Sequence, residues 1–181
     1  MQTRARRSGV RRAAAALAGG VALGCSPTFN WRESRPEGSG VALLFPCRPI
    51  KQERTVRIGT AALPMQIHSC TAGGSLFVLA VVDVADPAAL TSLLAAFRAQ
   101  AAANLAGTAT EQGPYSPAGA TPNPQSARIG IVGVRADGRR VVAQAVFFVK
   151  GLRLYQASVL EADDASGREA GDTFFGAIRL P

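Results

Sequence analysis

The chain is poor in the side chains on which most catalytic and metal sites depend. Its 181 residues include one histidine, three cysteines, two methionines and one tryptophan. No Gly-x-Ser-x-Gly motif occurs, and a Ser-His-Asp triad would have to use His68. Gly73-Gly74 is followed by neither Lys-Ser/Thr nor a helix-like run, so it is not a phosphate-binding loop. The sequence therefore predicts a protein that is not an enzyme and requires no cofactor.

The sequence also lacks an apolar run long enough to cross a membrane. The longest, Ala13 to Leu23, has eleven positions, whereas a membrane-spanning helix needs about 20 residues. A basic stretch without acidic residues precedes this run, which is the plan of an export signal. Its arginines are Arg4, Arg6, Arg7, Arg11 and Arg12. The paired arginines allow export by either the general or the twin-arginine route.

The end of the apolar run, Ala22-Leu23-Gly24-Cys25, resembles a bacterial lipobox. In such a motif the cysteine is lipidated on its thiol and becomes the new N-terminus, and several acyl chains anchor a protein stably. Ser26 then favours the outer membrane, with the domain facing the periplasm. The alternative is an ordinary secreted protein whose leader happens to contain a cysteine. The lipobox predicts residues 1–24 as a signal peptide of the lipoprotein type and Cys25 as the lipidated residue.

Removal of this leader changes the charge balance of the chain. The leader holds five of the 20 basic residues and none of the 12 acidic ones, which leaves 15 basic residues and a net charge of +3 rather than +8. The remaining arginines are scattered and are not clustered beside aromatic residues, as a nucleic-acid footprint requires. We therefore expect no nucleic-acid partner, and expect the membrane, through the lipid anchor, and an unidentified envelope protein instead.

Two cysteines remain once Cys25 is assigned to the lipid. Cys47 and Cys70 form an even pair in a compartment where disulfides persist, so we expect them to be bridged. Copper(I) binding by the soft ligands around Cys70, including Met65 and His68, is the alternative. In a strand, however, Met65 would point to the opposite face from His68 and Cys70. The alternation favours a disulfide, a structural histidine and no metal site.

Residues 25–40 are polar and rich in proline and glycine, and we expect them to act as a tether between the lipid and a single domain spanning residues 41–181. Phe29 and Trp31 lie within this segment. Docking of the two rings on the domain or at the membrane surface is the favoured interpretation because tryptophan usually contributes packing area. A recognition patch for a partner is the alternative.

The first half of the domain predicts strands followed by a helix. Val41–Phe45, Arg54–Ile58, Ala61–Cys70 and Ser75–Asp83 have the apolar runs or alternation of strands, and Pro64 would make the third an edge strand or give it a bulge. Asp86 and Pro87 are suitable for a helix start. Apolar residues at helical spacing follow, and Gly107 is expected to end the helix. These apolar residues are Leu90, Leu93, Leu94, Phe97, Ala101 and Leu105.

The second half predicts a loop, a meander and a last helix. Residues 108–127 contain four prolines and are expected to be irregular, with Tyr115 as a possible contact residue. Three strands follow at 128–135, 139–149 and 152–160, and Asp137-Gly138 is a strong hairpin signal. The acidic residues Glu161, Asp163, Asp164 and Glu169 are assigned to a solvated turn before a helix over 168–177. This order predicts an α+β fold with an antiparallel sheet and flanking helices.

Several of these segments also resemble a known group of domains. Phe45-Pro46, the central helix, Gly151-Leu-Arg-Leu-Tyr155-Gln-Ala and Asp172-Thr-Phe-Phe-Gly-Ala-Ile-Arg-Leu180 are similar to the Mog1/PsbP-like α-β-α sandwich domains. The chain also resembles small proteobacterial lipoproteins with Phe-Asn-Trp-Arg-Glu, Pro-Cys and Asp-Thr-Phe-Phe segments. The resemblance implies an adaptor or assembly role without a shared catalytic site. We therefore expect an envelope lipoprotein that acts through protein contacts. The alternative is a periplasmic small-ligand binder with loop 108–127 over a pocket between sheet and helix.

Overall fold

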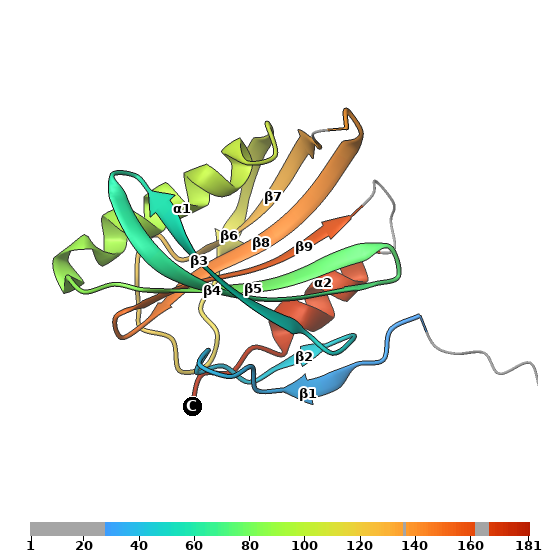
Figure 1. The fold of residues 1–181 in the computed structure, drawn as a ribbon, viewed down its shortest axis with the longest axis horizontal. Helices are drawn as coiled ribbons and strands as arrows, with labels where there is room; N and C mark the ends of the chain where they lie inside the picture. Colours follow the sequence, from blue (N-terminus) through green and yellow to red (C-terminus); the bar gives the residue numbers. More distant parts are fainter. Residues whose placement is uncertain (1–27, 136, 162–166) are drawn as a thin grey trace, which may run out of the picture.

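The computed structural model describes residues 28–135, 137–161 and 167–181. A seven-stranded antiparallel sheet forms the middle layer (Figure 1). In spatial order its strands are β3 (Ile50–Ile58), β4 (Ala61–Ala72), β5 (Ser75–Asp83), β9 (Arg153–Glu161), β8 (Arg140–Lys150), β7 (Ala127–Val134) and β6 (Thr108–Pro114). Helix α1 (Leu90–Ala103) lies on one face. Helix α2 (Gly167–Gly176) lies on the other, beside a small sheet of β1 (Arg32–Ser34) and β2 (Leu43–Phe45). The predicted α+β fold is confirmed.

Two meanders build the large sheet and meet at its centre. Strands β3 to β5 form one and β6 to β9 the other, and β5 pairs with β9. The hairpins between β7, β8 and β9 turn at Gly138 and Gly151, whose φ values of 81° and 55° suit glycine. The hairpin signals therefore predicted these turns correctly.

The alternation of side chains along each strand produces two cores. On β5, Phe77, Leu79 and Val81 face α2 and the small sheet, whereas Ala80 and Val82 face α1. The prediction that residues of β4 divide between the faces is also confirmed, because Met65 packs in the α1 core and Cys70 in the α2 core. Burial on both faces explains why β5 and the middle of β8 are almost entirely apolar.

Helix α1 begins as predicted but ends differently. The Asp86 carboxylate accepts a hydrogen bond of 2.9 Å from the Ala88 amide, and a short 3-10 turn, Pro87–Ala89, leads into the helix. At the other end the residue in the left-handed region is Ala106, with φ 44°, and not Gly107. Gly107 has a different role, since a Cβ there would lie 2.7 Å from the carbonyl oxygen of Val132. The glycine permits the close approach of the helix end to strand β7.

The prediction of an irregular segment over 108–127 is wrong for its first third. Residues 108–114 form the edge strand β6, which pairs with β7 and has an irregularity between Glu111 and Gly113. Almost every side chain of β6 is exposed. Backbone pairing forms this strand, so its sequence shows no apolar alternation.

The expected tether is also wrong for the residues that the structure describes. Residues 32–34 form β1 and pair with β2, and the Asn30 amide donates to the Pro46 carbonyl at 3.0 Å. The folded domain therefore begins before residue 41. The favoured docking of Phe29 and Trp31 is confirmed, because both pack against the core on the α2 face.

Pro64 produces neither an edge strand nor a bulge. Strand β4 lies inside the sheet, between β3 and β5. The pairing of β4 with β5 starts at Met65, so Pro64 pairs only with Thr55 of β3. A residue without an amide hydrogen is tolerated there because no second strand requires its donor.

Candidate functional site

A polar cleft opens on the α2 face of the sheet, beside the helix. Helix α2 packs against β2, β8 and β9. The hollow has a volume of about 520 Å³ and is lined by β6, β7, β8, the end of β9 and α2. Gly130 on β7 leaves room for the Gln112 side chain, since an added Cβ would lie 2.7 Å from Gln112 Nε2. The charged and amide residues at the cleft include Arg128, Arg140, Gln144, Glu161, Arg168 and Asp172.

Arg128 is fixed in the wall of this cleft by three neighbours. Its guanidinium donates to Gln144 Oε1 and forms an ion pair of 2.7 Å with Asp172 Oδ1. Its Cζ lies 5.3 Å from the centre of the Phe175 ring. The buried Nε–H has no hydrogen-bond partner among the described residues. The side chain is therefore held in place and still has a donor to offer.

Gln144 provides a second donor of this kind. The side chain is 5% exposed, and its Nε2 has no hydrogen-bond partner among the described residues. A guanidinium only donates, so the atom of Gln144 that faces Arg128 must be the oxygen and the nitrogen points elsewhere. Leaving a buried donor unpaired costs about 1–3 kcal/mol. A hydrogen-bond acceptor placed in the cleft would remove this penalty.

The described residues at the cleft carry more positive than negative charge. Among them, three arginines and two carboxylates line the cleft, which gives these residues a formal charge of +1. Arg168 lies in the first turn of α2, where the helix dipole adds positive potential. Glu161 is 3% exposed and belongs to β9, which corrects its predicted place in a solvated turn. Asp163 and Asp164 lie outside the described residues, and Glu169 is exposed in the first turn of α2.

The chemistry available in the cleft is hydrogen bonding and charge pairing. Of the described residues that line it, none is histidine, cysteine or serine. The described part of the chain also contains no group of three or more histidine, cysteine or acidic residues arranged to hold a metal ion. The arrangement can bind and orient a small polar molecule.

The residues that the sequence singled out do not line this cleft. Tyr115 packs in the α2 core, and its hydroxyl donates to the Phe175 carbonyl at 2.7 Å. Burial raises the pKa of Tyr115 far above its usual range. Phe29 and Trp31 lie together on Phe77, and Cys25 lies outside the described residues. The aromatic residues therefore have packing roles.

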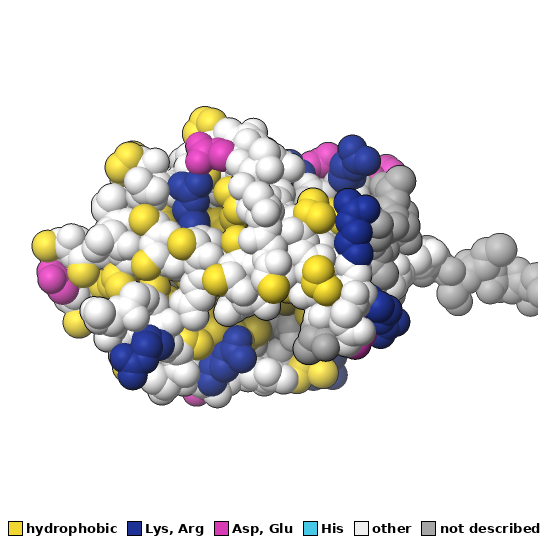
Figure 2. All heavy atoms as spheres, turned by 90° about the horizontal axis from the view of Figure 1, so that it is seen from above, with side chains coloured by type: hydrophobic (Ala, Val, Ile, Leu, Met, Phe, Trp, Pro, Cys, Tyr) yellow, Lys and Arg dark blue, Asp and Glu magenta, His cyan; other side chains and the backbone are white. Residues whose placement is uncertain are grey.

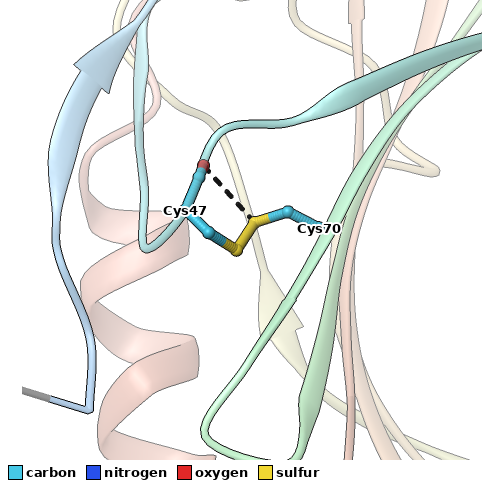
Figure 3. Close-up of a disulfide and its surroundings, with 2 residues drawn as sticks. All are labelled: Cys47 and Cys70. Atoms are coloured by element: carbon cyan, nitrogen blue, oxygen red, sulfur yellow. Dashed lines mark hydrogen bonds between the residues drawn. A yellow bond between two sulfur atoms is a disulfide. The ribbon is translucent and has the colours of Figure 1, made fainter.

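The predicted disulfide between Cys47 and Cys70 is present. Figure 3 shows it joining the loop after β2 to strand β4, and the Cα atoms are 6.0 Å apart. Cys70 is buried in the α2 core, and Cys47 packs against the same cluster. The bridge thus fixes the small sheet to the large one.

The segment after β6 forms no lid over the polar cleft or over the smaller groove between α1 and the sheet. Residues 115–126 line neither of these two hollows. Backbone bridges connect Ala118 to Arg179 and Thr121 to Val149, and Asn123 donates to Thr91 Oγ1 at 3.0 Å. This loop holds the C-terminal segment against the end of the sheet.

The groove between α1 and the sheet differs in character from the polar cleft. Its volume is about 180 Å³, and the sheet residues that line it are mostly apolar. Figure 2 looks onto this side and shows hydrophobic side chains in hollows, with basic residues around them. Leu76, Val78 and Leu160 are half-buried there. The groove offers apolar contact but few polar partners.

The one histidine is buried without full hydrogen bonding. His68 is 2% exposed, and its Nε2 has no partner among the described residues, so it is not the satisfied histidine that the sequence suggested. Burial lowers its pKa, and the charge of Lys51, opposite it on β3, acts in the same direction. Glu37 and Glu53 raise the pKa and do not outweigh burial.

The lowered pKa predicts an acid-sensitive domain. In the unfolded chain His68 takes up a proton near pH 6.5, whereas in the folded chain it does so at a lower pH. The contribution of neutral His68 to the free energy of unfolding is therefore complete above about pH 6.5. It is lost as the pH falls through the pKa of His68 in the folded chain. Denaturant unfolding between about pH 7 and 5 should show a decline that His68→Gln reduces. An equal decline in the variant would contradict this assignment.

The sequence motifs do not reveal the cleft, although one residue in the sequence signals it. Gln144 is the only polar residue from Val141 to Val149, a run that is otherwise apolar and mostly buried. A buried polar residue inside such a strand is costly unless it forms a hydrogen bond with another residue or with a ligand. Its pairing with Arg128 depends on the register of β7 and β8, which sequence alone does not provide.

Comparison with protein-family models and with curated proteins finds no match for this chain. Within the described residues, no helix combines the length and the hydrophobicity needed to cross a bilayer. The geometry of the cleft and the N-terminal motif are therefore the basis for interpreting the protein.

Proposed function

We propose that this protein is a lipid-anchored, non-catalytic component of the bacterial cell envelope that binds a small polar ligand in the cleft beside α2. One observation carries the proposal: the buried donors Gln144 Nε2 and Arg128 Nε are without partners among the described residues, beside a hollow of about 520 Å³. Ligand pockets commonly have volumes of about 300–1,000 Å³ and a few converging polar groups. The cleft combines both properties.

The anchor in this proposal is Cys25. The basic start, the apolar run and Ala22-Leu23-Gly24-Cys25 support lipidation, and Ser26 supports the outer membrane, with the domain facing the periplasm. The first described residue, Thr28, follows Cys25 by three positions. A domain that begins so close to its anchor would work near the membrane surface.

The fold family is proposed on the same basis. A seven-stranded antiparallel sheet lies between α1 on one face and α2 on the other. This layering supports the resemblance to the Mog1/PsbP-like domains. Adaptor members of that group suggest a second function, which is binding of an envelope protein. The apolar groove beside α1 favours it, because half-buried Leu76, Val78 and Leu160 are available for contact.

Mass spectrometry of the full-length protein from a Gram-negative envelope tests the anchor and the ligand together. Under denaturing conditions we expect a chain that begins at Cys25 and carries acyl chains. Under native conditions in a neutral detergent, we expect an additional small-molecule mass. Gln144→Met keeps the side-chain length but lacks the donor, so it should lose the small molecule and keep the lipid.

Two results would contradict the proposal. An unmodified N-terminus at another residue would make the protein soluble and remove the anchor. Absence of a bound small molecule, or its retention by Gln144→Met, would remove ligand binding from the cleft. Cys25→Ser is the matched control, because it should lose the lipid and keep the ligand.

A further inference from the structure

The charges around the cleft identify the class of ligand. We infer that the cleft binds an oxyanion, which is either a carboxylate or a phosphate group, through Gln144 Nε2, Arg128 Nε and Arg168. This inference rests on the proposed ligand binding. The protein would thus recognise a small organic acid, a phosphorylated compound or an anionic lipid headgroup. All three share the same acceptor chemistry.

Gln144 and Arg128 each bring an unpaired donor to the cleft, and a donor requires an acceptor. Gln144 Nε2 and Arg128 Nε are both buried and both lack partners among the described residues. Guanidinium groups bind carboxylate and phosphate through charge-assisted hydrogen bonds, which are shorter and stronger than neutral ones. An oxyanion presents several acceptor lone pairs and can satisfy both donors together.

Arg168 provides the net positive charge that an anion needs. The ion pairs among the described residues include Arg128 with Asp172 but do not include Arg168. Arg168 is exposed in the first turn of a ten-residue helix, where amide N–H groups also favour anions. The helix end and the unpaired Gln144 are independent features that favour the same kind of ligand.

The remaining charged groups at the cleft limit the ligand further. Asp172 already neutralises Arg128, and Glu161 is buried in the lining. Arg140 at the start of β8 adds a third positive charge. A cationic ligand would face three arginines, whereas an anionic group would be attracted to them. An anionic group on an otherwise polar molecule fits this lining.

Titration of the full-length lipoprotein in neutral-detergent micelles tests this inference. The probes are inorganic phosphate, succinate and neutral succinamide, and the readouts are calorimetry and NMR of the Gln and Arg side-chain N–H groups. We expect phosphate and succinate to bind at about millimolar concentration or below, and to shift the Gln144 signal. Succinamide should bind at least about tenfold more weakly because it lacks the charge.

Three variants assign the binding to named donors. Gln144→Glu keeps the acceptor for Arg128 but removes the donor, so it should abolish anion binding. Arg168→Gln should weaken binding at least about tenfold, and Arg168→Lys should restore part of it. Arg57→Gln, which removes an exposed arginine on the distant edge strand β3, is the matched control and should change nothing. Arg168 is exposed, so its variants should fold normally.

The outcomes separate this inference from the proposed function. If succinamide and succinate bind equally well, and Gln144→Glu loses both, the inference of an anionic ligand would be overturned. The proposed ligand binding in the cleft would then still hold. Absence of binding by all probes, together with no small molecule on the purified protein, would overturn both. Stronger binding to phosphatidylglycerol vesicles than to phosphatidylcholine vesicles, lost in Arg168→Gln, would support the inference and identify a headgroup as the source. Binding of phosphate and succinate without any preference for phosphatidylglycerol vesicles would support the inference and identify the ligand as a soluble anion.

Discussion

Replacement of both Cys47 and Cys70 by alanine should lower the free energy of unfolding by about 3 kcal/mol. The disulfide closes a loop with a sequence separation of 23, and the unfolded chain without it gains the corresponding freedom. The bridge also connects the loop after β2 to β4, so the small sheet should loosen first (Figure 3). Denaturant unfolding at constant pH measures the change.

Reduction of the unaltered protein is the control for this prediction. It breaks the same bond without shortening either side chain, so its effect should approach that of the double variant. The single variant Cys47→Ala leaves Cys70 as a lone buried thiol and should be about as destabilised as the double variant. Unchanged stability, with two titratable thiols before reduction, would show that the bridge does not form.

The parts of the fold that the sequence predicted are those whose local signals agree with their surroundings. Strand β5 is buried on both faces, so its apolar run is unambiguous. Asp86 and Pro87 start the helical region because capping depends only on neighbouring residues. The hairpins at Gly138 and Gly151 likewise require only a local positive φ.

The elements that the sequence missed depend on partners distant in the chain. Strand β6 exposes nearly all its side chains and exists because β7 presents a free edge. Strand β1 is three residues long and is formed by pairing with β2. Backbone pairing of this kind is nearly independent of side-chain type, so composition indicated a loop and a tether.

The candidate site shows the same division between local and distant information. A single polar residue inside Val141–Val149 could have been noticed in the sequence. The rest depends on the packing of α2, which brings Asp172 to Arg128 and places Arg168 at the cleft. The residues of the site come from three elements that meet only in the folded state.

Trp31→Ala should lower the free energy of unfolding by about 2 kcal/mol, less than the 3–5 kcal/mol typical of a fully buried aromatic residue. The ring is half-buried and lies edge-on to Phe77 at 5.7 Å between centroids, with Phe29 at 5.6 Å. Phe29 in turn packs on the β4–β5 turn, where a Cβ at Gly73 would lie 2.8 Å from its ring. Loss of the indole should therefore loosen the whole segment before β1.

Trp31→Phe is the matched control, because it keeps an aromatic ring against Phe77 and should lose less than half as much stability. The comparison separates the two roles that the sequence allowed for this segment. If the aromatic pair is a recognition patch that contributes nothing to folding, Trp31→Ala will unfold at the same denaturant concentration as the unaltered protein. A loss above about 1 kcal/mol that Trp31→Phe largely restores would assign the pair to the domain core.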